Sequence, residues 1–400
     1  MFRDHHLTVP WDRANPDMGT LDIYAREISL DDSLPFLLFL QGGPGFPATR
    51  PLEIDGWLAA ALRHYRVVLL DQRGTGRSGR IDRFSFADAP HLRLLGAPHI
   101  VADAEDLRRH LGVEQWDVLG QSFGGFCITV YLSRHPEAIG HAYFTGGLPA
   151  TSCGIDDVYR ASYTKLAARH REFYRDYPWV EEQIGRVIER LDLGVEKLPT
   201  GEVLTSRRFR TIGIELGRAT GFAALAALLE EPFHPGGQLR GDFLAELSAR
   251  LSFESGPLYA VIHESIYGGL VPGPTAWSAH RIREEFPEFA ESGAYLTGEH
   301  IFPWQFEEDP ALRPFAEAAE ELARVEEWEP PYDLSVLATS DAVCAAAVYT
   351  DDIFVPRELS LETAAHFKDL RVWESGEHQH DGLRRDGEAI FTRLYELAHE

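Results

Sequence analysis

The stretch WDVLGQSFGGFC, residues 116–127, joins one apolar run to another through a serine that is flanked by glycines. Gly120, Ser122 and Gly124 match the G-x-S-x-G nucleophile elbow, a sharp strand-to-helix turn that lifts a serine hydroxyl above a sheet. Side chains at the two glycine positions would collide with the neighbouring strands. The same residues could also form an ordinary tight turn, so the rest of the chain has to distinguish the two interpretations.

Short β-rich runs alternate with helical patterns over the first 150 residues. Strand and helix in alternation are the signature of a parallel sheet covered by helices, so the sequence predicts an α/β fold. The expected strands are residues 21–30, 34–41, 66–72, 116–120 and 141–147, and the expected helices are residues 99–112 and 123–136.

The chain changes character after this alternating region. Residues 150–335 are mostly helical and rich in aromatic residues and glutamate, whereas strand-like patterns return at 342–349 and 369–375. We therefore expect an α/β core formed by residues 1–149 and 336–400, interrupted by a helical cap at 150–335. Such a cap would lie over the carboxyl ends of the strands, where open α/β sheets bind ligands.

Charge excludes two classes of partner. The 400 residues carry 63 acidic and 38 basic side chains, a formal net charge of −25. This balance argues against binding nucleic acid or an anionic membrane, because both require a positive surface. An acidic surface suits a positively charged substrate, although it serves solubility equally well.

The termini and the cysteines indicate a cytoplasmic protein. The N-terminal MFRDHHLTVPWDR is charged and has no apolar core, so no signal peptide is expected. No apolar run approaches the roughly 20 residues that a membrane-spanning helix needs. Cys127, Cys153 and Cys344 are scattered, which is consistent with neither a disulfide framework nor a metal site. The sequence carries no sign of the oligomeric state.

A serine nucleophile needs backbone donors for the oxyanion that forms on the substrate. The loop QGGPG (41–45) directly follows an expected strand, and its glycines leave backbone N–H groups unobstructed. We assign the oxyanion hole to the N–H groups of Gly43 and Phe123. A phosphate loop is the rival interpretation, but no Gly-Lys-Ser/Thr follows. A plain Pro-Gly turn is the other alternative.

The acid and the base are expected after the cap, in the chain order serine, acid, histidine. Asp351 and Asp352 stand at the end of one expected strand, and His378 and His380 follow the next one. Histidine would accept the serine proton, and the carboxylate would orient and stabilise the imidazolium. Placement alone leaves both choices open.

Six motifs carry a resemblance to a known family: QGGPG (41–45), DQRGTGRS (71–78), GQSFGG (120–125), TGGLP (145–149), VYTDDIFVP (348–356) and EHQHDGL (377–383). With these residues assembled, the chain resembles the prolyl aminopeptidases (proline iminopeptidases), a family with a capped α/β-hydrolase fold. The family usually has histidine where this chain has Gln41, a change that should retune the oxyanion loop without abolishing catalysis because the donor is a backbone amide. We expect Asp71 and Arg73 to brace the DQRGTGRS loop through a salt bridge.

The resemblance implies a function and a choice among the candidate residues. It implies Asp352 as the acid and His380 as the base, with Asp351 and His378 as alternatives. It implies a serine aminopeptidase that releases N-terminal proline from peptides through an acyl-enzyme on Ser122. An esterase or amidase of the same fold is the alternative, because the cap selects the substrate. A binding protein without activity is disfavoured by the intact catalytic set, and no metal or organic cofactor is expected.

The cap should recognise the charged amine of the substrate. The stretches PLYAVIHESIYG (257–268) and YLTGEHIFPWQFEEDP (295–310) each place a glutamate among aromatic residues. We predict Glu264 and Glu299 as anchors for the amine and Phe302 and Trp304 as walls for the proline ring. The alternative is that the aromatics are ordinary cap core and the glutamates lie on solvated helix faces.

Overall fold

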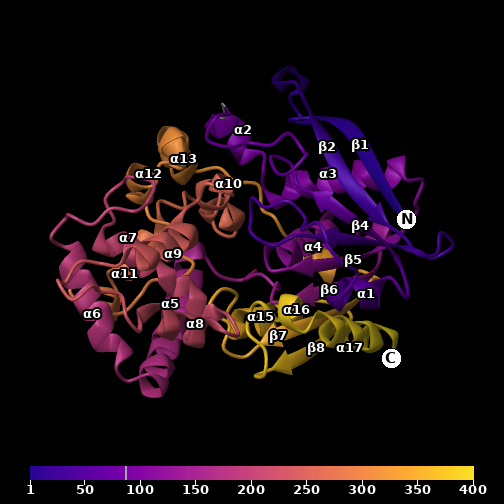
Figure 1. Ribbon diagram of the computed structural model, residues 1–400. Coiled ribbons are helices and arrows are strands. Elements are labelled where there is room, and N and C mark those ends of the chain that lie inside the picture. The colour runs from indigo at the N-terminus through magenta and orange to yellow at the C-terminus, as the bar shows by residue number, and fades with distance from the viewer. Residues whose placement is uncertain (86–87) are drawn as a thin grey trace.

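The computed structural model describes residues 1–85 and 88–400. Among these residues, eight strands form one sheet in the order β1-β2-β4-β3-β5-β6-β7-β8 (Figure 1). The strands are β1 (Phe2–Pro10), β2 (Thr20–Ile28), β3 (Phe36–Leu40), β4 (Arg66–Asp71), β5 (Trp116–Gln121), β6 (Ile139–Thr145), β7 (Val343–Tyr349) and β8 (Leu370–Ser375).

Most neighbouring strands in this sheet are parallel. β1 pairs with β2 and β2 pairs with β4 in antiparallel register, and the strands from β4 through to β8 are parallel. The expected strands are confirmed as β2 to β8. Strand β1 was not expected, because it is an edge strand whose exposed and half-buried residues alternate without an apolar run.

Helices cover both faces of the sheet, as strands buried on two sides require. Leu37 and Phe39 of β3 pack in one apolar cluster with helices α1 (Gly56–Ala61) and α17 (Gly387–His399), while Leu38 and Leu40 pack in another with α3 (Ala97–His110) and α4 (Phe123–Arg134). This alternation follows from the period of two along a strand. The predicted α/β architecture, mostly parallel with helices on both faces, is confirmed.

The remaining helices complete the chain. Those of the sheet region are α1 (Gly56–Ala61), α2 (Ala89–Arg93), α3 (Ala97–His110), α4 (Phe123–Arg134), α14 (Leu334–Leu337), α15 (Arg357–Ala364), α16 (Gly382–Arg385) and α17 (Gly387–His399). Those between β6 and β7 are α5 (Ile155–Asp176), α6 (Val180–Leu191), α7 (Ser206–Arg210), α8 (Gly221–Leu229), α9 (Gly241–Leu251), α10 (Pro257–Val261), α11 (Ser278–Arg283), α12 (Gln305–Glu308) and α13 (Ala316–Ala323).

Helices α5 to α13 follow one another along the chain between β6 and β7. They gather beside the sheet and form the left half of the molecule in Figure 1. Short 3-10 helices connect them, among them Thr211–Gly217 and Glu264–Tyr267. None of the described helices is both long and apolar enough to cross a membrane.

Hydrogen bonds tie this helical segment to the loops that follow β7 and β8. The Ser162 hydroxyl donates to the carbonyl oxygen of Ile353 at 3.0 Å, and the Lys165 ammonium donates to that of Thr350 at 3.1 Å. The backbone N–H of Ala219 donates to the Asp381 carboxylate at 2.9 Å. The helical segment therefore stabilises the two loops that carry the candidate acid and base.

Candidate active site

Ser122 occupies the sharp turn between β5 and α4. Its backbone has φ 54° and ψ −125°, a conformation that side chains rarely adopt, and its N–H donates to the Thr145 carbonyl oxygen at 3.0 Å. A Cβ on Gly120 would lie 2.5 Å from the Gly124 carbonyl carbon, and a Cβ on Gly124 would overlap the Leu40 carbonyl oxygen. The flanking glycines are thus required by close backbone approach, which is the elbow geometry that the sequence predicts.

Two of the candidate side chains after β7 and β8 meet Ser122. The His380 Nε2 atom lies 2.9 Å from the Ser122 Oγ atom, and the His380 Nδ1 atom lies 2.7 Å from Asp352 Oδ2. The other oxygen of Asp352 accepts hydrogen bonds from the N–H groups of Phe354 and Val355, at 2.8 and 3.0 Å. The carboxylate is fixed, and it holds the imidazole with Nε2 facing the serine.

The two alternative residues lie elsewhere. The His378 Nδ1 atom is 2.9 Å from the Ser375 hydroxyl and its Nε2 atom is 3.3 Å from the Asp386 carboxylate. Asp351 is partly exposed and makes no side-chain hydrogen bond among the described residues. The geometry therefore favours Asp352 and His380 over both of their neighbours.

The environment of His380 favours its protonated form. Burial alone would lower the pKa of His380, but the charge and hydrogen bond of Asp352 outweigh burial, so the pKa is raised above 6.5. A base of this kind can accept a proton from serine and return it later at near-neutral pH.

The loop QGGPG lies against the elbow. A Cβ on Gly42 would be 3.0 Å from the Ser122 Cβ and 2.8 Å from the Gln121 carbonyl oxygen. Gly43 lines the same cavity as Ser122, and Phe123 is the first residue of α4, where an N–H group has no acceptor within its own helix. Phe123 is therefore adjacent to the serine in the chain, and Gly43 lines the cavity into which the serine opens.

The prediction of a salt bridge between Asp71 and Arg73 is wrong, because each residue pairs with a different partner. Arg73 points to the other side of the loop, where its guanidinium donates to Asp103 at 2.7 and 2.8 Å. Asp71 instead pairs with Arg50 at 2.5 Å and accepts the N–H of Arg77 at 2.9 Å. Asp71 is the last residue of β4, whereas Arg73 lies in the turn that follows, and each pairs with a residue distant in sequence.

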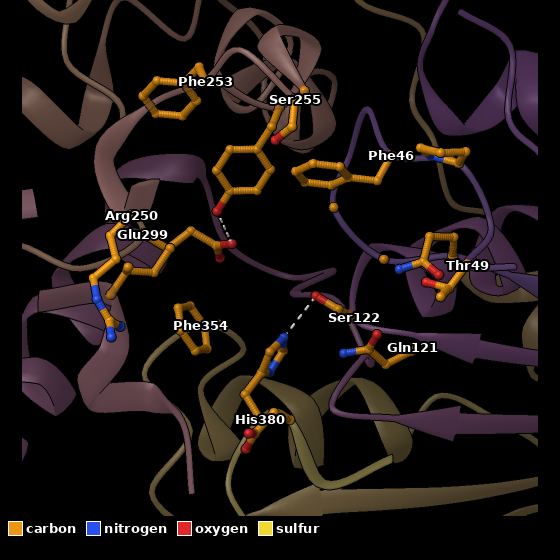
Figure 2. Close-up of a pocket in the computed structure, with 18 of the residues that line it drawn as sticks. Phe46, Thr49, Gln121, Ser122, Arg250, Phe253, Ser255, Glu299, Phe354 and His380 are labelled. Carbon is orange, nitrogen blue, oxygen red and sulfur yellow. Dashed lines mark hydrogen bonds between the residues drawn. The ribbon is translucent and has the colours of Figure 1, made fainter. Parts of the chain in front are cut away.

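A cavity of about 1030 Å³ opens above the serine. Figure 2 shows Glu299 and Ser122 facing the same open space, with Phe46, Phe354 and His380 around it. The part of the wall that faces the serine thus combines aromatic surface with the carboxylate of Glu299, which suits a small apolar group that carries a positive charge.

Glu299 is the predicted amine anchor that reaches this cavity. Its carboxylate accepts a hydrogen bond from the Tyr259 hydroxyl (Figure 2). Burial raises the pKa of Glu299 to about 7, while the nearby His380 and the Tyr259 hydrogen bond act in the opposite direction. A ligand cation beside this carboxylate would favour its ionised form.

The other predicted pocket residues do not line the cavity. Glu264 accepts the N–H groups of Ser278 and Ala279 at 3.0 and 2.9 Å, so it caps the first turn of α11, and burial raises its pKa to about 7. Phe302 and Trp304 stack on each other, with ring centroids 5.4 Å apart, within the helical segment. Phe302 and Trp304 are buried, as the alternative interpretation of ordinary core has it, whereas Glu264 is buried as well and does not lie on a solvated helix face.

Four aromatic residues of the cavity wall were missed. They are Phe46, Phe253, Tyr259 and Phe354. Phe46 directly follows the loop QGGPG, and Tyr259 and Phe354 lie within stretches that the sequence analysis singled out, so proximity to those motifs was the available signal for these three. Among the described residues, no group of three or more His, Cys, Asp or Glu side chains is arranged to hold a metal ion.

Comparisons with known proteins bear on the whole chain. A family model described as alpha/beta hydrolase fold matches residues 35–184. A proline iminopeptidase of Aeromonas sobria is 40% identical, covering 98% of this chain and 95% of the relative. A proline iminopeptidase of Aspergillus aculeatus is 29% identical, covering 97% of this chain and 92% of the relative. The solved structure of esterase E22 is 11% identical, covers 100% of both chains and has a TM-score of 0.52, and this likeness concerns the fold alone.

Proposed function

Because the chain belongs to the proline iminopeptidase family of α/β-hydrolases, we propose that Ser122, His380 and Asp352 form the catalytic triad of a peptidase that releases N-terminal proline. The observation that carries this proposal is the continuous relay from Asp352 through His380 to Ser122, at 2.7 and 2.9 Å, which opens into a cavity facing Glu299.

The chemistry proceeds in two halves. The Ser122 Oγ atom attacks the carbonyl carbon of the substrate proline while His380 Nε2 accepts the hydroxyl proton. His380 then donates this proton to the leaving nitrogen, and the C–N bond breaks to give a prolyl ester on Ser122. Water attacks the ester with His380 as general base, and proline leaves as the serine regains its proton. Asp352 holds the imidazole and stabilises its charged form.

The N–H groups of Gly43 and Phe123 stabilise the negative charge that develops on the carbonyl oxygen. Their advantage is that they are already oriented before the reaction, so no reorganisation is needed as the charge forms. Removing one donor of this kind typically costs about 100- to 1000-fold in turnover.

Glu299 selects the free amine of the substrate. Its carboxylate lies in the cavity wall opposite the serine, and the aromatic rings of Phe46, Tyr259 and Phe354 supply apolar surface for the pyrrolidine. An ion pair with a charged hydrogen bond in such a site is stronger than one in water. The segment 150–335, which contributes Glu299, acts as the substrate-selecting cap of a core formed by residues 1–149 and 336–400.

The substrate is a peptide with a free N-terminal proline, and the protein works in the cytoplasm. The three cysteines are all free, and two of them are buried. Free thiols without a disulfide partner are typical of proteins in a reducing compartment.

The test compares three compounds that differ in one feature each. Proline arylamide should be cleaved, and N-acetyl-proline arylamide, which lacks the amine charge, should be a poor substrate. p-Nitrophenyl acetate measures the reactivity of Ser122 without amine recognition. If the acetylated compound is cleaved as fast as the free amine, the protein is an esterase or amidase of this fold instead.

A further inference from the structure

Six arginines line the cavity, and one of them differs from the rest. Five have an acidic side chain within 4.0 Å, whereas Arg384 has none among residues 1–85 and 88–400. The five pairs are Arg50 with Asp71 at 2.5 Å, Arg77 with Asp4 at 3.1 Å, Arg80 with Asp82 at 3.8 Å, Arg218 with Glu215 at 2.9 Å and Arg250 with Glu246 at 2.8 Å.

The Arg384 guanidinium also makes no hydrogen bond within the described part of the chain. A guanidinium offers five N–H donors in a planar fork that matches a carboxylate. Arg384 stands in α16, one turn after Asp381, whose carbonyl oxygen accepts its backbone N–H at 2.9 Å. Its donors are therefore available to a ligand in the cavity.

A second arginine is held close to Arg384. The N–H of Ala219 is bound to the Asp381 carboxylate at 2.9 Å, which brings the adjacent Arg218 to the same wall of the cavity. Partial burial lowers the pKa of Arg384, and the positive charge of Arg218 lowers it further. A bound anion would offset the electrostatic repulsion between these two guanidinium groups.

The position of these arginines relates them to the leaving half of the substrate. His380 must donate its proton to the leaving nitrogen, so the peptide that departs passes the His380 side of the cavity. Arg384 follows His380 by four residues and lines the same cavity. The amine of the substrate, by contrast, is held at Glu299.

We propose that Arg384, assisted by Arg218, binds the C-terminal carboxylate of a short peptide, so that the enzyme prefers prolyl peptides of two to four residues. This inference rests on the proposed peptidase function and adds the length and the free C-terminus of the substrate. Each further residue extends a peptide by about 3.3–3.6 Å, so the preference should be greatest at one length.

The first experiment compares acids with amides. Pro-Gly, Pro-Gly-Gly and Pro-Gly-Gly-Gly are each assayed with a free C-terminus and as the C-terminal amide. At one length or more, kcat/KM should be about 5- to 10-fold higher for the acid, the effect of a charged hydrogen bond that stays partly solvated. Equal values for acid and amide at all three lengths would overturn the inference.

The second experiment assigns the preference to Arg384. In Arg384→Gln the ratio of acid to amide should fall to about one, and in Arg384→Glu the amide should become the better substrate. Arg385→Gln is the matched control, because Arg385 is exposed, as Arg384 is, but does not line the cavity. Retention of the preference in Arg384→Gln, or its loss in Arg385→Gln, would contradict the assignment.

Proline arylamide separates this inference from the proposed function, since it carries no carboxylate. A native enzyme that cleaves the arylamide but treats acids and amides alike retains its function and loses the carboxylate site. A native enzyme that fails to cleave the arylamide loses both.

Discussion

The elbow at Ser122 and the cavity wall at Glu299 face each other across one cavity, but they are built by different means. The elbow depends on residues close in sequence, and Gly120 is required there because a Cβ at this position would lie only 2.5 Å from backbone atoms of Gly124. The wall brings Tyr259 to Glu299 across 40 positions and sets both against the core. Local sequence therefore specifies the first region, and tertiary packing specifies the second.

Two glutamates of the helical segment sharpen this contrast. Burial raises the pKa of both Glu264 and Glu299 to about 7. Glu264 nevertheless caps a helix, while Glu299 faces the cavity. A perturbed carboxyl group indicates a function only when its surroundings leave it free to meet a ligand.

The largest effect is expected at the elbow. Ser122→Ala removes the nucleophile, so turnover of proline arylamide should fall roughly 10⁴- to 10⁶-fold. The thermal midpoint should stay close to that of the native protein, because the hydroxyl makes no packing contact of its own. Near-normal hydrolysis by the purified variant would show that the elbow is only a turn.

The next effect separates neighbouring candidates after β7 and β8. His380→Ala and Asp352→Asn should each lower kcat by about 10⁴-fold, because each removes a part of the proton relay. His378→Ala and Asp351→Asn are the matched controls and should change kcat by less than about 3-fold. A severe loss at His378 with little effect at His380 would reverse the assignment.

A smaller and selective effect is expected at the cavity wall. Glu299→Gln should lower kcat/KM for proline arylamide by about 10- to 100-fold, the value of a charged hydrogen bond. Hydrolysis of p-nitrophenyl acetate should be much less affected. Glu264→Gln is the matched variant and should alter the thermal midpoint rather than the ratio of the two activities. Equal selectivity losses in both variants would extend the amine site to Glu264.

The pH profile provides an independent measurement of the same wall. Glu299, with a pKa of about 7, must lose its proton to attract the amine, and His380, with a raised pKa, must lose its proton to act as base. Activity on proline arylamide should therefore rise with pH through the neutral range, with the two ionisations together shaping the ascending limb. In Glu299→Gln only one ionisation should remain, and an unchanged steepness would contradict the role of Glu299.

The smallest effect is expected at Tyr259. Its hydrogen bond lowers the pKa of Glu299, so Tyr259→Phe should raise that pKa and shift the ascending limb toward alkaline pH. KM for proline arylamide at neutral pH should increase by about 3- to 10-fold, the range of a single neutral hydrogen bond. A pH profile that stays in place would show that Tyr259 does not tune the carboxylate.

The sheet and the family could be predicted from sequence because their signals are local and repeated. Apolar runs marked β3, β4 and β7, and the motifs around Gly43, Ser122 and the late acid and histidine identified the family. Strand β1 was not predicted, because an edge strand needs no apolar run and this one has none. The pairing of Arg73 with Asp103 was not predicted, because the two residues are 30 positions apart and only the fold brings them together.

The cap pocket was less predictable for the same physical reason. Glu264 and Glu299 stand in similar aromatic surroundings in the sequence, and nothing local separates a helix cap from a cavity wall. Phe302 and Trp304 satisfied the compositional expectation for a proline pocket, yet they pack on each other. Residues in this helical segment contact residues that are far away in the sequence. Composition alone therefore does not indicate which side chains line the substrate cavity.

The bonds from Ser162, Lys165 and Ala219 to the loops around Asp352 and His380 have a consequence for protein engineering. A chimaera that receives its cap from another hydrolase would lose these three donors and with them the lateral support of two catalytic loops. Low activity in such a chimaera would then report a misaligned triad rather than an unsuitable pocket. Transplanting the three donor positions together with the new cap keeps the exchange interpretable.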